Sequence, residues 1–170
     1  MNHPRPAKAH KMIISIGKAC PYFQKKIFSQ SPTMLYKELE VQRHQDLTES
    51  LLKVLSDLRA ESESGAVILV EGERDEECLK RLGINGTILR YTSIRALLSW
   101  AESNSKTRLI VLTDLDAEGR RIAKKVVASL SGRVREVNTS YIRRLSIVRR
   151  MGISEIKDIG NLVPDGWPIY

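Results

Sequence analysis

Two short, uninterrupted apolar runs constrain the fold of this chain more than any other feature. Residues 66–70 read Ala-Val-Ile-Leu-Val, and residues 109–112 read Leu-Ile-Val-Leu. Both runs have the length of a strand, and a strand that is apolar at every position is typically buried on both faces. Such strands are usual in parallel sheets with helices packed on each side. Neither run approaches the roughly 20 residues that a membrane-spanning helix needs.

Around these two runs, segments with helical apolar spacing alternate with further strands. Ser93 is suited to cap one helix, and Gly83 and Gly132 are suited to end two others. We therefore predict an α/β fold of the Rossmann-like type, with about four parallel strands and helices on both faces of the sheet. The expected elements are a helix from about residue 46, a strand at 66–70, a helix at 75–82, a strand at 87–90, a helix after Ser93, a strand at 109–112, a helix ending near 130, a strand at 134–137, and weaker helices at 141–151 and 154–162.

The composition excludes several architectures. The chain has 170 residues, which suits one domain with a single hydrophobic core. Its two cysteines, Cys20 and Cys78, and its three scattered histidines match neither a structural zinc site nor a disulfide framework. We therefore expect free thiols, a reducing cytoplasmic location and no membrane association.

The net charge of +8 is unevenly distributed along the chain. Residues 1–45 carry eight Lys or Arg and two Glu, whereas residues 46–116 carry nine basic and thirteen acidic side chains. Residues 117–150 carry ten Lys or Arg against two Glu. A basic excess of this kind favours a polyanionic partner such as nucleic acid, and the alternative is a set of solvated charged faces.

The N-terminal segment differs from the rest of the chain. Its first 33 residues contain four prolines and no acidic residue. We predict that residues 1–45 form a basic, poorly ordered extension, and that residues 46–165 form a single domain. The extension is open to three interpretations: a nucleic-acid-binding arm, a transit-like segment, or an upstream stretch that is absent because translation starts at Met34.

Acidic side chains follow both apolar runs. Glu71 comes directly after the first run, and Asp114 and Asp116 follow the second. Ligands of open α/β sheets bind beyond the carboxyl ends of the strands. If the two strands are neighbours, three carboxylates converge there, and in extended backbone Asp114 and Asp116 point the same way. Such a cluster of hard oxygen ligands is suited to Mg²⁺.

Several of these residues also have simpler structural explanations. Asp116 is suited to cap the helix that begins at residue 117, and Asp75 to cap or complement the first turn of the preceding helix. Gly72 and Gly119 are candidates for tight turns. Glu71 is harder to explain in this way, because a carboxylate directly after five apolar strand residues is costly to bury without a function.

The two motifs together resemble the Toprim domain, the catalytic module shared by topoisomerases, bacterial-type primases and ribosomal-RNA maturation nucleases. Val-Glu-Gly-Glu-Arg-Asp at residues 70–75 resembles its Glu-Gly motif, and Leu-Thr-Asp-Leu-Asp-Ala-Glu-Gly at residues 112–119 resembles its Asp-x-Asp motif. The resemblance covers about residues 66–137. It continues loosely through residues 142–144 and 152–162, which are similar to the tail of small stand-alone Toprim proteins of archaeal type. Many relatives have Lys where this chain has Glu73.

This resemblance implies specific roles. Glu71 would be the general acid or base and a metal ligand, and Asp114 and Asp116 would bind Mg²⁺, for which Mn²⁺ is a possible substitute. The implied activity is Mg²⁺-dependent phosphodiester chemistry on nucleic acid, of nuclease or nucleotidyl-transfer type, with RNA favoured over DNA by analogy to the maturation nucleases. The alternatives are a non-catalytic nucleic-acid-binding accessory protein with a phosphate-binding or metal-binding module, and a small-molecule phosphohydrolase.

A basic segment follows the second acidic motif. We expect its side chains to bind phosphates of the nucleic acid beside the carboxylates, and the alternative is a solvated helix face. The candidates are Arg120, Arg121, Lys124 and Lys125 on the helix after the motif, with Arg143 and Arg144 extending the track.

Overall fold

The computed structural model describes residues 32–164 and Trp167. The chain divides into two compact units, residues 1–45 and residues 46–170. Helix α3 (Pro32–Glu63) contributes residues 32–45 to the first unit and residues 46–63 to the second. The helix therefore begins at Pro32 rather than near residue 46. The three interpretations of the N-terminal extension, as a nucleic-acid-binding arm, a transit-like segment or an untranslated stretch, mainly concern residues 1–31, which lie outside the described residues.

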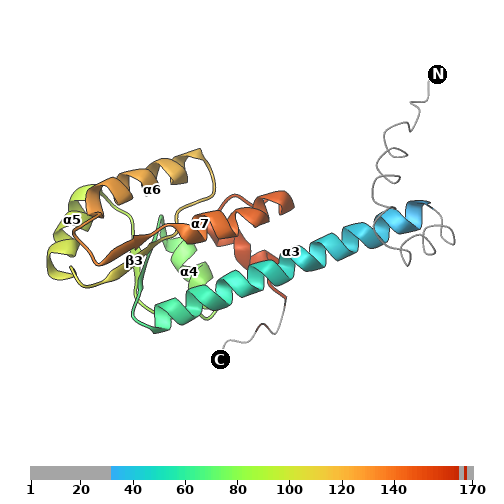
Figure 1. Ribbon diagram of the computed structural model, residues 1–170, viewed down its shortest axis with the longest axis horizontal. Coiled ribbons are helices and arrows are strands. Elements are labelled where there is room, and N and C mark those ends of the chain that lie inside the picture. The colour runs from blue at the N-terminus through green and yellow to red at the C-terminus, as the bar shows by residue number, and fades with distance from the viewer. Residues whose placement is uncertain (1–31, 165–166, 168–170) are drawn as a thin grey trace, which may run out of the picture. The chain divides into compact units, whose positions relative to one another are not determined.

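The second unit contains a four-stranded parallel sheet (Figure 1). Its strands are β1 (Val67–Val70), β2 (Ile88–Arg90), β3 (Arg108–Val111) and β4 (Glu136–Asn138), in the spatial order β2-β1-β3-β4. The register pairs Leu69 with both Leu89 and Val111. The predicted α/β fold with four parallel strands is confirmed.

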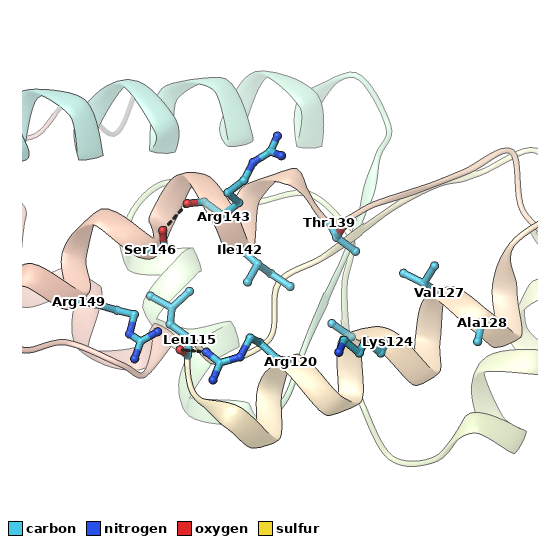
Figure 2. Close-up of a pocket in the computed structure, with 11 residues that line it drawn as sticks. Leu115, Arg120, Lys124, Val127, Ala128, Thr139, Ile142, Arg143, Ser146 and Arg149 are labelled. Carbon is cyan, nitrogen blue, oxygen red and sulfur yellow. Dashed lines mark hydrogen bonds between the residues drawn. The ribbon is translucent and has the colours of Figure 1, made fainter.

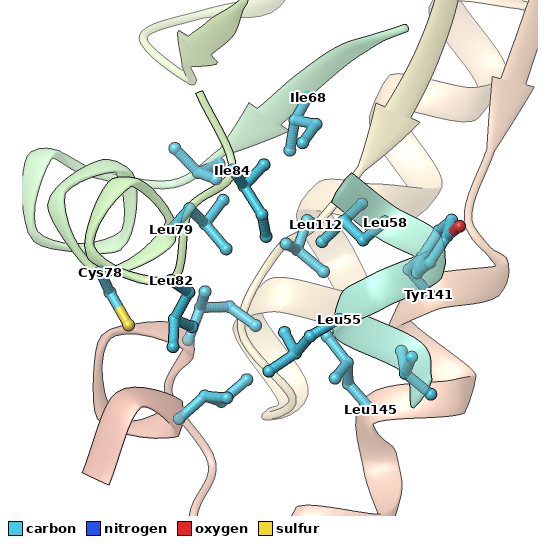
Figure 3. Packing of buried hydrophobic residues seen from close by; sticks show 14 of the residues in the cluster. Leu55, Leu58, Ile68, Cys78, Leu79, Leu82, Ile84, Leu112, Tyr141 and Leu145 are labelled. Carbon is cyan, nitrogen blue, oxygen red and sulfur yellow. The ribbon is translucent and has the colours of Figure 1, made fainter. Parts of the chain in front are cut away.

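Helices cover both faces of this sheet, and alternate strand residues face opposite layers. Ile68 and Ile110 pack with α3 and with α4 (Glu73–Arg81), in the core cluster shown in Figure 3. Leu69 and Val111 pack on the other side against α5 (Ile94–Ser103) and α6 (Ala117–Leu130). The continuous apolar runs of β1 and β3 arise because both faces of these strands are buried.

The C-terminal segment folds into shorter elements than expected. The helix predicted at residues 141–151 divides into α7 (Ser140–Leu145) and the 3-10 helix η1 (Ser146–Met151), and the helix predicted at 154–162 is the 3-10 helix η2 (Ile156–Leu162). In η2 the apolar residues Ile156, Ile159 and Leu162 recur every third position. A 3-10 helix has three residues per turn, so this spacing places all three on one side, against the core.

Two further observations concern the described residues. None of the helices within them is both long enough and apolar enough to cross a membrane.

Cys78 is a free thiol that lies fully buried in the core, and burial raises its pKa. Cys20 lies outside the described residues.

Candidate functional site

The two strands that carry the acidic motifs are direct neighbours. From β1 the chain crosses to β2 on one side, and it returns to β3 on the other side of β1. The strand order thus reverses between β1 and β3, and open α/β sheets bind their ligands at the carboxyl ends of such a strand pair. Glu71 and Asp114 lie just beyond the carboxyl ends of these strands, and the Asp114 N–H donates to Oε1 of Glu71 over 2.9 Å. The structure thus places Glu71 beside Asp114, through the Asp114 backbone rather than through its carboxylate.

Backbone N–H groups hold the two aspartates of the second motif in place. Oδ1 of Asp114 accepts from the Ile156 N–H at 2.8 Å. Oδ1 of Asp116 accepts from the Gly119 N–H at 2.7 Å and so caps α6, as the structural interpretation of this residue predicted. The chain bends at residues 115–116, so the extended geometry expected for the Asp-x-Asp segment is wrong. The bend turns each aspartate toward a different backbone partner.

Asp75 has a structural role at this edge. It is only 6% exposed, and its two oxygens accept from the N–H groups of Gly72, at 2.9 Å, and of Lys157, at 3.1 Å. The first of these bonds caps the start of α4, which confirms the predicted capping role. With both oxygens engaged, Asp75 serves as an anchor between α4 and η2.

We call the edge of the sheet that carries Glu71, Asp114 and Asp116 the acidic edge; backbone hydrogen bonds join residues 154–157 to part of it and to Asp75. Ile156 and Lys157 donate to Asp114 and Asp75, and the Leu115 N–H donates to the Ser154 carbonyl over 2.7 Å. This segment also brings Glu155 close enough for its charge to act on Asp75 and Asp114. The side chains of Glu155 and Lys157 form an ion pair. Sequence reasoning missed both residues; the only signal was the similarity of residues 152–162 to a family tail.

Burial and mutual repulsion make the acidic edge electrostatically strained. Burial raises the pKa of the Glu71 carboxyl, although the hydrogen bond from Asp114 partly offsets this effect. The negative charges of Asp114 and Asp116 raise the pKa of Glu71 further. The pKa of Asp114 is raised in the same way, first by burial and then by nearby carboxylates, against the lowering effect of the Ile156 N–H. A positive charge at this edge would relieve the repulsion.

The carboxylate oxygens of Glu71, Asp114 and Asp116 are of the kind that binds a hard divalent cation. Mg²⁺ prefers oxygen ligands, and it commonly takes one or two carboxylates together with waters and substrate phosphate. In the part of the chain that the structure describes, no hydrogen bond engages the second carboxylate oxygen of Glu71, Asp114 or Asp116. Within the same residues, no group of three His, Cys, Asp or Glu side chains forms a ready-made ligand set. Glu71 and Asp114 are thus the side chains best placed to hold a cation, with water and phosphate completing its shell.

The two candidate turn glycines differ. A Cβ at Gly119 would lie 2.1 Å from the carbonyl oxygen of Asp114, so only glycine fits there. The buried hydroxyl of Thr113 donates to the Gly119 carbonyl over 2.9 Å and ties the loop together. Gly72 has an extended backbone, with φ −142°, and its nearest contact to a Cβ would be an ordinary 3.7 Å. Gly72 lies in a bend of the chain, but its backbone and its surroundings do not require glycine.

The basic candidates divide into two groups. Arg120 and Lys124 line a pocket between α6 and α7, and Arg143 lines it from α7. Arg121 and Lys125 lie elsewhere on the exposed surface of α6, and Arg121 pairs with Glu118. Of the four candidate cations on α6, two therefore line the pocket and two do not.

Arg144 departs from the predicted track. Its guanidinium group pairs with Asp57 of α3 and lies over the ring of the buried Tyr141, 5.0 Å from the ring centre. These contacts tie α7 to α3 and place Arg144 in the packing of the domain.

Glu73 stands where many Toprim relatives have Lys. Its exposed side chain forms an ion pair with Arg90 over 3.0 Å.

The pocket has a volume of about 570 Å³ and combines two kinds of lining (Figure 2). Aliphatic side chains line it from the motif loop, α6 and α7, and cationic side chains stand among them. In Figure 2, Arg120 and Arg149 extend toward each other beside Leu115, whereas the guanidinium group of Arg143 extends away from them. The aliphatic lining residues are Leu115, Ala123, Val127, Ala128 and Ile142, and the polar ones are Arg120, Lys124, Thr139, Arg143, Ser146 and Arg149.

Sequence comparison relates the chain to a group of archaeal proteins. A UPF0292 protein of Methanocaldococcus jannaschii is 33% identical over 123 residues, which cover 71% of this chain and 95% of that relative. The chain belongs to the UPF0292 family. A UPF0292 protein of Pyrococcus abyssi is 32% identical over 100 residues, covering 59% of this chain and 76% of that protein. No family model matches the chain.

A solved structure supports the fold of this UPF0292 protein. A putative protein from Aquifex aeolicus superposes with a TM-score of 0.52 and 25% sequence identity, over 62% of this chain and 94% of that chain. The archaeal origin of the sequence relatives is consistent with the expected archaeal type.

Proposed function

We propose that this UPF0292 protein carries out Mg²⁺-dependent phosphodiester chemistry on nucleic acid, as its resemblance to Toprim domains implies. The observation that carries the proposal is the joining of Glu71 and Asp114 by a backbone hydrogen bond at the point where the strand order reverses. Two acidic residues from separate motifs, each with a carboxylate oxygen that accepts no hydrogen bond within residues 32–164, lie at the edge where this class of sheet binds substrates.

Each residue of the edge has a distinct role in this proposal. Glu71 acts as the general acid or base, because its raised pKa brings proton exchange closer to neutral pH. Asp114, oriented by the Ile156 N–H, would hold the cation, and Asp116, which caps α6, would contribute negative charge to the site. The bound cation would neutralise phosphate charge and favour in-line displacement, which is most of what phosphoryl transfer requires.

The substrate is proposed from the resemblance together with the charge distribution. Ribosomal-RNA maturation nucleases make RNA the favoured substrate over DNA, and the cations of the pocket lie beside the acidic edge, where phosphates of a bound strand would be neutralised. A cytoplasmic location stays a prediction from cysteine usage.

The test is cleavage of end-labelled structured RNA and single-stranded DNA, with Mg²⁺, with Mn²⁺ and with EDTA. We expect metal-dependent cleavage by the wild type and a loss of about 100-fold or more in Glu71→Gln, since general acid–base catalysis contributes at least that much. Glu73→Gln is the matched control, because Glu73 is an exposed carboxylate two positions away. Equal cleavage by the wild type and Glu71→Gln would contradict the proposal.

A non-catalytic, nucleic-acid-binding role is the second candidate. It is favoured by the hydrogen bonds that the Asp114 and Asp116 carboxylates accept from the backbone, because these give both residues a structural purpose. This role predicts that Glu71→Gln binds nucleic acid in EDTA as tightly as the wild type does, and that neither protein cleaves it with any metal. Cleavage that disappears in Glu71→Gln but persists in Glu73→Gln excludes it.

A further inference from the structure

The pocket between α6 and α7 has the lining expected for an amphiphilic anion. Its aliphatic side chains come from three separate elements, Arg120, Lys124 and Arg149 stand among them, and the lining contains no acidic residue. Arg143 also lines the pocket, but its guanidinium group extends away from Arg120 and Arg149. Within residues 32–164, Lys124, Arg143 and Arg149 form no ion pair. Cations without acidic partners beside an apolar surface suit a ligand that carries both a phosphate and an apolar or planar group.

The pocket shares a wall with the acidic edge. The side chain of Leu115 lines the pocket, and its chain neighbours are Asp114 and Asp116. Arg120 donates from Nη1 to the Leu115 carbonyl over 3.0 Å, which holds this guanidinium group at the boundary between pocket and edge (Figure 2). A ligand in the pocket therefore lies one residue away from the carboxylates to which we assign the chemistry.

We propose that this pocket binds one unpaired nucleotide of the nucleic-acid strand, next to the phosphodiester at the acidic edge. The base packs on Val127 and Ile142, and its phosphate lies between Arg120, Lys124 and Arg149. A volume of about 570 Å³ is within the range of small-ligand pockets and has room for a base with its sugar. Thr139 makes no capping bond to α7, so its hydroxyl is available to the edge of the base.

This inference rests on the proposed function for its polynucleotide partner and adds a preference within that class. A base that is paired in a duplex is stacked and cannot enter a side pocket, whereas unpaired bases in loops, bulges and overhangs can be splayed out. The protein should therefore bind unpaired segments more tightly than blunt duplexes at equal length and salt.

The experiment measures binding alone, by fluorescence anisotropy in EDTA, where no cleavage occurs. The probes are a short fluorescein-labelled single-stranded RNA, the same strand with abasic sites at its centre, and a blunt duplex. Ala128→Phe fills the pocket from an exposed position of α6, and Ala96→Phe, on an exposed position of α5, is its control. We expect Ala128→Phe to weaken binding of the strand with bases by about tenfold and of the abasic strand by less than about twofold.

A second pair of variants separates the pocket from general surface charge. Lys124→Ala removes a cation that lines the pocket, whereas Lys125→Ala removes its exposed neighbour on the same helix. Lys124→Ala should weaken binding to the single strand several-fold more than Lys125→Ala, and this difference should vanish on the blunt duplex. Equal effects of the two lysines on the single strand would indicate a diffuse basic surface and overturn the inference.

Two other results would also overturn it. Loss of abasic-strand binding in Ala128→Phe as large as the loss for the strand with bases would show that only phosphates are recognised. Full competition by adenosine monophosphate at the affinity of the strand would assign the pocket to free nucleotides. Because all of these measurements are made without metal, failure of this inference can be distinguished from failure of the proposed cleavage activity.

Discussion

The acidic edge and the basic pocket lie side by side, yet they are built in opposite ways. At the edge, Glu71, Asp114 and Asp116 each have one carboxylate oxygen held by a backbone N–H. In the pocket, the cations are long side chains at the surface, and only Arg120 is tied to the backbone of the pocket wall. One region fixes its charges in position, and the other leaves them able to adapt.

This difference matches two different tasks. Charges that are aimed at a reacting phosphate must be in place before the reaction, because reorganisation would add to the barrier. Charges that bind successive phosphates of a flexible strand need only be nearby, and their contribution depends mainly on salt. The tight packing of the edge and the looser arrangement of the pocket are therefore expected to respond differently to substitution.

The largest effect on folding should come from the backbone of the edge. Gly119→Ala places a Cβ on the Asp114 carbonyl, so the motif loop must shift, and we expect the free energy of unfolding to fall by about 3 kcal/mol. Gly72→Ala has room for its Cβ, and its cost should stay below about 1 kcal/mol. Urea denaturation of both variants measures the difference. Similar losses would mean that the edge is no more rigid at Gly119 than at Gly72.

A smaller effect should separate the two neighbouring arginines of α7. Arg144→Ala removes the ion pair to Asp57 and the contact with the Tyr141 ring, at a cost of about 1 kcal/mol. Arg143→Ala removes an exposed side chain and should change stability by less than about 0.5 kcal/mol. Thermal unfolding at equal salt compares the two. If Arg143→Ala were the more destabilising variant, the division of the basic residues into structural and pocket groups would be wrong.

The smallest predicted effect is a gain in stability at the edge. The pKa of Asp114 is raised in the folded protein, so its charged form opposes folding above that pKa. Asp114→Asn should therefore raise the unfolding temperature at pH 7.5 in EDTA by up to a few degrees, and the gain should shrink as falling pH protonates the wild-type carboxyl through its raised pKa. A gain that is constant between pH 7.5 and pH 4 would show that ionisation of Asp114 is not its cause.

Strand patterns made most of the fold predictable. The runs at residues 66–70 and 109–112 are apolar at every position because both faces of β1 and β3 are buried, and this placed Glu71 and Asp114 at the same edge. The C-terminal helices were expected, but their division and their 3-10 geometry were not, because apolar spacings of three and of three to four residues are hard to distinguish over few residues.

The details of the site depended on contacts between distant parts of the chain. Glu155 and Lys157 reach the edge because η2 packs on α4, which no local pattern indicates. Predicting the pocket would have required the relative placement of α6 and α7. Helical spacing alone grouped Lys124 with Lys125, although of these two residues only Lys124 lines the pocket. The bend at residues 115–116 was hidden by the apparent continuation of strand β3.

The central claim, that the carboxylate edge holds a divalent cation, is tested most directly by Mn²⁺ binding followed by electron paramagnetic resonance of the free ion. We predict that the wild type binds Mn²⁺, that Asp114→Asn weakens this binding by about tenfold or more, and that Glu118→Gln, an exposed carboxylate on the next helix turn, leaves it unchanged. Mg²⁺ should displace the bound Mn²⁺. Binding of equal strength in the wild type and Asp114→Asn would contradict the claim.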